Sequence, residues 1–372
     1  MFHVKHPRGP GPLEAVRASL AALETGGLLR ESRPPPADRD DAVSFRSNDY
    51  LGLAAGGHGA GASRLVGGDK EEHRALEAAV AFWLGADSGL LFASGYAANV
   101  GLLSALGDAG TLLVSDELNH ASLIDGARLA RARVCITPHL DLDAVREALD
   151  ARVEPVAWVV VESYYSMDAD SPDLGALATI CREASAGLIV DEAHAIGVFG
   201  PGGRGLAAEH GVEPEARLVA FGKAFGAQGG MVVGASEIRE LLWNRARSFV
   251  FSTGVSPRLV ADLATQLDRV KRGDDLRANL HARAHQLRAG LSSLGLDVRG
   301  HGPIVPVVLG HPGRAVDIAR ALGDLGVSVQ AIRPPSVPAG TARIRMTLSA
   351  VSTESSVQHA LAAWARVLER FT

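Results

Sequence analysis

Short apolar runs alternate with amphipathic segments along most of this 372-residue chain. The runs are rich in β-branched residues, which is typical of buried strands. Many of them are separated by segments with apolar residues three and four positions apart, the spacing of a helix that buries one face. The expected strands are Gly89–Ala93, Thr111–Ser115, Val134–Thr137, Val156–Val161, Leu188–Asp191, Leu218–Phe221 and Met231–Val233. This alternation predicts an α/β fold with a mostly parallel, doubly wound sheet.

Further segments lie before, within and after the expected sheet region. Residues 13–29 have helical periodicity, and the prolines that follow at 34–36 are expected to stop that helix. Another helix is expected from Asp69, whose side chain is suited to cap it. After residue 261 a long arginine-rich helix is expected, followed by strands near Ile304–Leu309, Val327–Ile332 and Ile344–Leu348. The sequence therefore predicts a helical arm over 1–44, a large α/β domain over 45–260 and a small α+β domain over 261–372.

Composition indicates a globular chain and excludes several classes of partner. Hydrophobic residues make up 47% of the sequence, and a net charge of −5 argues against nucleic acid as a ligand. Cys135 and Cys181 fall in apolar segments, so reduced thiols and a cytoplasmic location are expected. Residues 1–10 lack the apolar core of a secretory signal, and no run is long enough to span a membrane. We expect neither export nor a membrane partner.

The strand that ends in Asp191 carries the first chemical signal. An acid at the carboxyl end of a buried strand lies where open α/β sheets place their ligands. His194 follows three residues later, and Lys223 follows 32 residues after Asp191. Lys223 is one of four lysines against 33 arginines, and its glycine and aromatic neighbours favour a desolvated amine with a lowered pKa. A carboxylate, a histidine and a nucleophilic amine together suggest pyridoxal phosphate (PLP) chemistry.

Other interpretations explain single residues of this group. An acid after a strand often caps a turn, and a lysine between glycines is often a solvated loop residue. The letters of Asp191–His194 also occur in nucleic-acid helicases, but no G-x-x-x-x-G-K-[ST] loop precedes them and Lys223 is followed by alanine. Neither cysteine lies in a ligand-spaced pair, and no H-E-x-x-H motif occurs, so no metal is expected. The coincidence of the acid, the histidine and the lysine favours the PLP interpretation.

Several longer motifs resemble those of one known family. They are Ser47–Leu53, Ser94–Asn99, Asn119–Leu123, Ser166–Asp168, Asp191–His194 and Phe221–Gly226. Together they are similar to the α-oxoamine synthases, which are fold-type I PLP enzymes, and the resemblance covers nearly the whole chain. Residues Ala331–Arg345 resemble the biotin-pathway members. The resemblance implies a homodimer that condenses L-alanine with a pimeloyl thioester of coenzyme A or acyl carrier protein, giving 8-amino-7-oxononanoate, CO2 and free thiol.

The resemblance also implies a role for each matching residue. Lys223 is expected to bond the cofactor covalently and to move the substrate's α-proton, while Asp191 pairs with the pyridine nitrogen. His194 is expected to contact the phenolic oxygen, and His120 to stack on the ring. The remaining cofactor contacts implied are Gly95 and Tyr96 at a helix N-terminus, Glu162, Ser166, Ser252 and Thr253. The substrate contacts implied are Arg30, Asn48, His120, Ser336 and Arg345.

Two departures from the family pattern stand out. Ala220 occupies the position three residues before Lys223 where the family usually has a phosphate-binding threonine. Ser252 and Thr253 are candidates to compensate, since the equivalent segment of relatives reaches the phosphate across the dimer interface. The region between Leu53 and Ser63 is also shorter than in the family, which affects the expected substrate entrance.

Three alternative functions remain open from the sequence. One is another α-oxoamine synthase that uses glycine or serine with a different acyl thioester. Another is a noncatalytic PLP-binding partner subunit, against which the presence of Lys223, Asp191 and His120 argues. The third is an aminotransferase.

Overall fold

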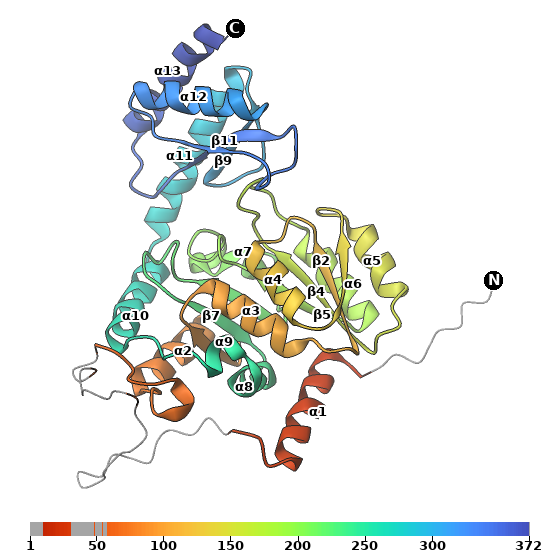
Figure 1. Ribbon diagram of the computed structural model, residues 1–372. Coiled ribbons are helices and arrows are strands. Elements are labelled where there is room, and N and C mark those ends of the chain that lie inside the picture. The colour runs from red at the N-terminus through yellow and green to blue at the C-terminus, as the bar shows by residue number, and fades with distance from the viewer. Residues whose placement is uncertain (1–9, 31–47, 49–53, 55–57, 372) are drawn as a thin grey trace, which may run out of the picture. The chain divides into compact units, whose positions relative to one another are not determined.

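The computed structural model describes residues 10–30, 48, 54 and 58–371, which form two compact units (Figure 1). Unit 1 comprises the residues up to Ser163 together with Pro172–Arg272, and unit 2 comprises Tyr164–Ser171 together with the residues from Gly273. The expected boundary at residue 261 falls inside helix α10 (Pro257–Lys271), which lies wholly in unit 1. Val260, Leu263 and Leu267 of α10 belong to the core of unit 1, which explains why the division comes after this helix.

A seven-stranded sheet forms the centre of unit 1. Its strands are β1 (Ser88–Phe92), β2 (Thr111–Asp116), β3 (Arg133–Thr137), β4 (Val156–Glu162), β5 (Gly187–Asp191), β6 (Ala216–Ala220) and β7 (Gly230–Gly234). Their spatial order is β1-β7-β6-β5-β4-β2-β3. Only β7 runs antiparallel to its neighbours, β1 and β6; the other pairs are parallel. The prediction of a mostly parallel sheet is confirmed.

Helices cover both faces of this sheet, and alternate strand residues enter separate cores. The helices of unit 1 before α10 are α1 (Pro12–Thr25), α2 (Glu71–Leu84), α3 (Gly95–Leu106), α4 (Ala121–Leu129), α5 (Leu142–Asp150), α6 (Leu174–Ala184), α7 (Gly205–Glu209), α8 (Ser236–Arg245) and α9 (Arg247–Val250). On β1, Leu90 and Phe92 join one hydrophobic cluster, whereas Leu91 joins the other. Burial on both faces is why the strands are nearly continuous apolar runs.

Two helix ends differ from the sequence-based expectation. Helix α1 ends at Thr25, well before the prolines, because Gly26 and Gly27 follow and Gly27 has a φ of 65°. Helix α2 begins at Glu71, and its start is completed by the His73 Nδ1 atom, which accepts a hydrogen bond from the Lys70 amide at 3.1 Å. The expected cap, Asp69, instead forms ion pairs with two arginines, since a charged partner outcompetes a single amide.

Unit 2 has an antiparallel sheet with helices packed on one face. Its strands β8 (Asp297–Val298), β9 (Ile304–Gly310), β10 (Gln330–Ile332) and β11 (Ala342–Thr347) lie in the order β10-β11-β9-β8. Helices α11 (Asp274–Ser293), α12 (Pro312–Asp324) and α13 (Glu354–Phe371) share a core with β9 and β11, in which Trp364 is fully buried. This arrangement agrees with the expected α+β domain, although β8 was not anticipated and β10 begins three residues later than expected.

Both cysteines are free thiols, as predicted. Cys181 is buried in α6 and Cys135 is half-buried on the edge strand β3. Burial raises the pKa of the Cys181 thiol to about 12, which keeps it protonated and unreactive. Among the described helices, none combines the length and apolar character needed to cross a membrane.

Candidate active site

Acidic, basic and imidazole side chains gather around the carboxyl ends of β4 and β5. Glu162 ends β4, Asp191 ends β5, and the two are register partners in the sheet. His120, in the loop after β2, donates its backbone N–H to Glu162 Oε1 at 2.6 Å. Lys223, in the turn after β6, interacts electrostatically with both acids. The structure thus brings four of the predicted site residues together at one edge of the sheet.

Asp191 is a buried carboxylate with a hydrogen bond on each oxygen. Its side chain is 5% exposed. Oδ1 accepts from the Ala193 amide at 2.8 Å, and Oδ2 accepts from Asn99 Nδ2 at 2.7 Å. Burial raises the pKa of Asp191, whereas these two donors and the charge of Lys223 act in the opposite direction. A cation bound against this carboxylate would favour its ionised form, as a protonated pyridine nitrogen does.

Glu162 is the second buried acid of the site. Burial first, and then the negative charge of Asp191, raise its pKa well above the usual range. Two adjacent buried carboxylates do not both ionise easily, because each charge lacks water and repels the other. Asp191 accepts a hydrogen bond on each oxygen, which favours its ionised form, whereas burial and the charge of Asp191 disfavour the ionised form of Glu162.

His120 is positioned by the first turn of α4. It is the residue before the helix, and its Nδ1 atom lies 2.8 Å from Ser122 Oγ and accepts from the Ser122 amide at 3.2 Å. The residue is exposed while Ser122 is buried, so the imidazole is held by its inner edge. A ring held in this way has a face available for stacking. His194 is half-buried in the turn that directly follows β5.

Lys223 is exposed in this chain, which contradicts the expectation of a desolvated amine. The reason lies in its neighbours: Phe221 and Phe225 both point into the core and contact each other edge-to-face at 5.0 Å. The turn between them is closed by a hydrogen bond from the Gly226 amide to the Lys223 carbonyl, with Gly226 at a φ of 62°. The aromatic anchors leave the lysine on the open side, where its amine is accessible.

Helix α3 begins beside the end of β6. Ser94 caps the helix by accepting a hydrogen bond from the Ala97 amide at 3.1 Å. A Cβ atom placed on Gly95 would lie 3.3 Å from the Ala220 methyl group, so the glycine allows the two backbones to approach closely. Tyr96 is 49% exposed, and its hydroxyl donates to Asp125 at 2.5 Å. The group of Tyr96 expected to contact a phosphate is therefore its backbone N–H and not its side chain. A helix N-terminus of this kind favours a bound anion.

The segment with Ser252 and Thr253 lies against residues 62–68. Thr253 forms a β-bridge with Ser63, and the Gly254 amide donates to the Ala62 carbonyl at 3.0 Å. Neighbouring Arg64 is buried and forms ion pairs with Asp69 and Glu77. This network fixes the backbone on which the two hydroxyl residues stand.

Two of the expected substrate residues make other contacts in unit 1. The Arg30 amide donates to Asn244 Oδ1 at 2.6 Å, and its guanidinium donates to the Asn244 carbonyl at 3.1 Å. These bonds join the segment after α1 to α8. The Asn48 amide donates to the Gly61 carbonyl at 2.9 Å, and its side chain is exposed. The structure brings neither residue into the cluster around Asp191.

The other expected site residues belong to unit 2. Ser166 is half-buried. Ser336 is exposed in a turn, and its backbone N–H donates to the Arg333 carbonyl at 3.0 Å. Arg345, on β11, is half-buried, and its Nε atom is buried without a hydrogen-bond partner. Burial lowers the pKa of Arg345. A partly desolvated guanidinium whose Nε atom has no hydrogen-bond partner is suited to bind an anion.

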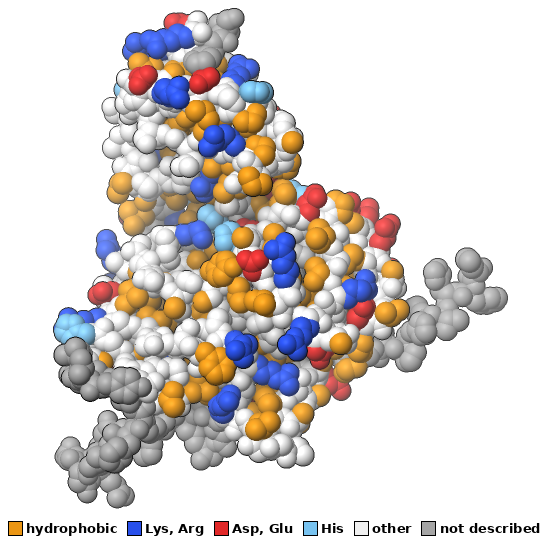
Figure 2. Space-filling view, in the orientation of Figure 1, with side chains coloured by type: hydrophobic (Ala, Val, Ile, Leu, Met, Phe, Trp, Pro, Cys, Tyr) orange, Lys and Arg blue, Asp and Glu red, His pale blue; other side chains and the backbone are white. Residues whose placement is uncertain are grey.

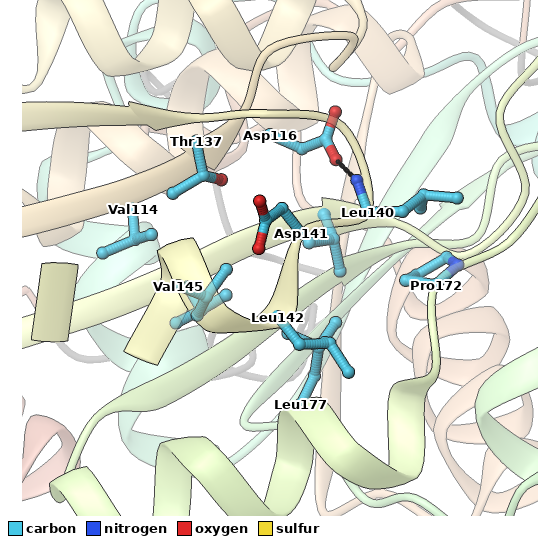
Figure 3. Close-up of a pocket in the computed structure, with 11 residues that line it drawn as sticks. Val114, Asp116, Thr137, Leu140, Asp141, Leu142, Val145, Pro172 and Leu177 are labelled. Atoms are coloured by element: carbon cyan, nitrogen blue, oxygen red, sulfur yellow. Dashed lines mark hydrogen bonds between the residues drawn. The ribbon is translucent and has the colours of Figure 1, made fainter. Parts of the chain in front are cut away.

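A small pocket between the sheet and helices α5 and α6 does not compete as a ligand site (Figure 3). Its apolar walls include Val114, Val145 and Leu177, and Asp116 at its edge accepts from the Leu140 amide at 2.9 Å. Its volume of about 10 Å³ accommodates about one water molecule. Within the described residues, no group of three or more His, Cys, Asp or Glu side chains is arranged to hold a metal ion.

Comparisons with known proteins decide the family. The protein-family model described as "Aminotransferase class I and II" matches residues 40–363 of this chain. The chain belongs to this family. It is 42% identical to the 8-amino-7-oxononanoate synthase of Anaeromyxobacter dehalogenans (strain 2CP-1), with 96% of each chain covered. It is 44% identical to the 8-amino-7-oxononanoate synthase of Mycolicibacterium smegmatis, with 89% of this chain and 90% of the relative covered.

Solved structures of this family have the same fold. A serine palmitoyltransferase from S. paucimobilis with bound PLP has a TM-score of 0.81 and 26% identity, covering 96% of this chain and 98% of that one. The predicted resemblance to the α-oxoamine synthases and the predicted fold-type I architecture are both confirmed.

Two residues of this family member that sequence reasoning did not assign also belong to the site. Asn99 and Ser122 are each 1% exposed and are hydrogen-bonded to each other at 2.9 Å. Asn99 lies in a largely apolar helix, and an amide among residues that are otherwise apolar or small was the available signal. A buried amide requires partners, but the sequence does not reveal which ones.

Proposed function

We propose that this chain is a PLP-dependent enzyme that condenses L-alanine with a pimeloyl thioester, forming 8-amino-7-oxononanoate and releasing CO2 and the free thiol. The relatives at 42% and 44% identity carry the name of that synthase and match almost the full chain. The structural observation that supports the proposal most is the buried carboxylate of Asp191 with Lys223 and His120 beside it.

The described residues fit PLP. Asp191 is a buried carboxylate suited to a protonated ring nitrogen, because burial otherwise disfavours its charge. Lys223 has an accessible amine for the covalent link, and the N-terminus of α3 at Gly95 is suited to a phosphate. When bound, PLP stabilises the negative charge that develops at the amino acid's α-carbon as a bond there breaks.

The proton transfers are assigned to the chain's own side chains. The Lys223 amine, which would also hold the cofactor covalently, is assigned as the base for the α-proton of L-alanine, and its ammonium would return a proton after CO2 has left. Asp191 would favour the protonated form of the ring nitrogen, and Glu162 holds the backbone of His120 by accepting its N–H. His120 would cover one face of the ring and exclude water from it.

Arg345 is the group assigned to the carboxylate of L-alanine. Its buried Nε atom lacks a partner, and a carboxylate supplies an acceptor and a charge at once. The acyl carrier is either coenzyme A or acyl carrier protein. The enzyme is a homodimer in this proposal, and its cytoplasmic location stays a prediction.

Covalent labelling tests the cofactor assignment directly. The protein saturated with PLP is reduced with borohydride, digested and analysed by mass spectrometry, with Lys271→Ala and Lys223→Ala as matched variants. We expect the PLP mass on the Lys223 peptide of wild type and of Lys271→Ala, and on no peptide of Lys223→Ala. An unmodified Lys223 peptide in the wild type refutes the assignment.

A substrate panel tests the reaction. CO2 release is measured for L-alanine, glycine and L-serine, each with pimeloyl-CoA, pimeloyl acyl carrier protein and shorter or longer acyl thioesters. The proposal requires L-alanine with a pimeloyl thioester to be the preferred pair. Preference for glycine or serine assigns a different α-oxoamine synthase reaction, and PLP binding without turnover on any pair assigns a noncatalytic subunit. Exchange with keto acids in the absence of thioester indicates an aminotransferase.

A further inference from the structure

Asn99 connects two residues of the site through a single amide group. It lies in the second turn of α3, between the end of β5 and the start of α4, and its Nδ2 atom has two acceptors. One hydrogen bond goes to Asp191 Oδ2 at 2.7 Å, and the other goes to Ser122 Oγ at 2.9 Å. Both amide hydrogens are thereby used, and the residue is 1% exposed.

The donor and the acceptor of each hydrogen bond between Asn99, Ser122 and His120 follow from the chemistry of the groups. An amide nitrogen only donates, so Ser122 Oγ is the acceptor toward Asn99. The Ser122 hydroxyl hydrogen is then available for His120 Nδ1, which lies 2.8 Å away. The Ser122 backbone amide donates to the same Nδ1 atom at 3.2 Å. Two donors therefore face Nδ1, and the ring proton is assigned to Nε2.

The orientation of the Asn99 amide is also determined by its partners. Turning it around would place Oδ1 against the carboxylate of Asp191 and would remove the donor from Ser122. In the observed orientation the buried Oδ1 atom has no hydrogen-bond partner. The two donor bonds are thus retained at the expense of an unpaired acceptor, which is destabilising by itself. If the amide served only stability, hydrogen-bond partners for all of its polar atoms would be expected.

We propose that Asn99 is a positioning residue that fixes Asp191 for the cofactor's ring nitrogen and, through Ser122, fixes His120 as the Nε2–H tautomer. The inference rests on the proposed function, in which Asp191 and His120 contact PLP. Asn99 itself touches neither cofactor nor substrate in this proposal. A change at the Asn99 amide should therefore affect both the Asp191 carboxylate and the His120 imidazole.

Three variants separate the effect of the hydrogen bond from Asn99 to Asp191 from the effect of the path through Ser122 to His120. Asn99→Leu keeps the side-chain size and removes both donors. Ser122→Ala removes the hydroxyl and leaves the bond between Asn99 and Asp191 intact. Asn244→Leu is the matched control, since Asn244 is also a buried asparagine whose amide donates twice, to the Arg30 and Glu240 carbonyls. Should Asn99→Leu fail to fold, Asn99→Ser removes the same amide and is measured in its place.

The tautomer is measured on the full chain without cofactor, by nitrogen-15 NMR of histidine-labelled protein. The His120 signals are assigned by their loss in His120→Gln. We expect wild type and Asn244→Leu to show an unprotonated Nδ1 and a protonated Nε2. In Asn99→Leu and in Ser122→Ala, the two nitrogens should move toward the average of the two tautomers. Unchanged His120 signals in both variants overturn the tautomer assignment.

The second readout is the equilibrium dissociation constant for PLP. Loss of a hydrogen bond to a charged group should weaken PLP binding by about tenfold or more in Asn99→Leu. Ser122→Ala and Asn244→Leu should stay within about twofold of wild type, because the bond to Asp191 remains. Equal PLP affinity for Asn99→Leu and Asn244→Leu overturns the positioning role. The NMR experiment needs no cofactor, so its success alongside an unlabelled Lys223 would refute the proposed function alone.

Discussion

At the residue scale, burial determines which acids near β5 carry charge. Glu192 follows Asp191 and is fully buried. Its Oε1 atom accepts from the Ala207 amide at 2.9 Å, and its Oε2 atom lies 3.8 Å from Arg217. Burial is the main cause that raises the pKa of Glu192 to about 7. Gly205 packs directly on this carboxylate: its φ is 84°, and a Cβ atom there would lie 2.5 Å from the Glu192 oxygens.

This raised pKa predicts a stability that falls as pH rises. The folded chain binds the Glu192 proton more tightly than the unfolded chain, so its contribution is complete below about pH 4.5 and is lost through about pH 7. A shift from 4.5 to about 7 corresponds to roughly 3 kcal/mol of unfolding free energy. In Glu192→Gln this loss should be absent, so the variant should gain stability relative to wild type between pH 5 and pH 8 in urea unfolding.

Glu154→Gln provides a control of opposite sign for that measurement. The Arg133 guanidinium lowers the pKa of Glu154 to about 2, so the contribution of Glu154 is present above its usual pKa and is lost only as pH falls toward 2. The difference between Glu154→Gln and wild type should therefore stay constant from pH 5 to pH 8. A constant difference for Glu192→Gln over the same range would contradict the buried, protonated state of Glu192.

Arg345 leads to a second prediction at this scale. In Arg345→Lys the charge remains, but the Nε donor and the planar fork are lost. If Arg345 binds the carboxylate of L-alanine, the KM for L-alanine should rise by roughly 10- to 100-fold, with a smaller change in kcat. The exposed Arg333→Lys is the control and should leave KM unchanged. Equal KM values for the two variants in steady-state assays would remove Arg345 from the substrate site.

At the element scale, the contact between β6 and α3 determines how the phosphate end is built. Ala220 ends β6 and its methyl group faces Gly95, the first residue of α3. Family members usually have a threonine hydroxyl at this position. Ala220→Thr should therefore add a donor and lower the dissociation constant for PLP by about tenfold. Ala220→Val has the same shape without the hydroxyl, and equal affinities of the Thr and Val variants would show that this position does not contact the phosphate.

The elements also show which parts of the fold were predictable. The strands of unit 1 were located to within two residues at each end, because their two buried faces produce continuous apolar runs. Helix ends were less predictable, since they depend on specific partners: Asp69 lost its expected capping role to Arg64 and Arg74. The boundary between the units lies after Arg272 and not at residue 261 for a similar reason: α10 packs its apolar face on residues far earlier in the chain.

The candidate site was predictable where a motif names its own residues. Asp191 and Lys223 were predicted from local sequence and His120 from the family resemblance, and the structure places them around one sheet edge. The exposure of Lys223 was missed, because glycine and aromatic neighbours do not reveal which side chain of a turn faces the core. Asn99 was missed because its partner Asp191 lies 92 residues away along the chain.

At the scale of the whole molecule, the surface carries exposed apolar side chains among charged ones (Figure 2). Phe82 on α2 is 85% exposed, and Phe251 is 70% exposed with Arg247 stacked on its ring at 4.7 Å. Phe251 directly precedes Ser252 and Thr253, the residues expected to reach a phosphate across a dimer interface. Large exposed aromatic groups of this kind are typical of surfaces that associate. They support the proposed homodimer, in which each site contains residues from both copies.

Shared sites predict complementation between two inactive variants. Lys223→Ala lacks the covalent lysine, and a Ser252→Ala, Thr253→Val double variant lacks the hydroxyls of the other copy. In a mixed dimer, one site receives both defects and the other receives neither. Mixing equal amounts under conditions of subunit exchange should restore about one quarter of wild-type activity, since half of the dimers are mixed and each has one intact site. If Ser252 and Thr253 instead serve the site of their own chain, every site in a mixed dimer keeps one defect and no activity returns.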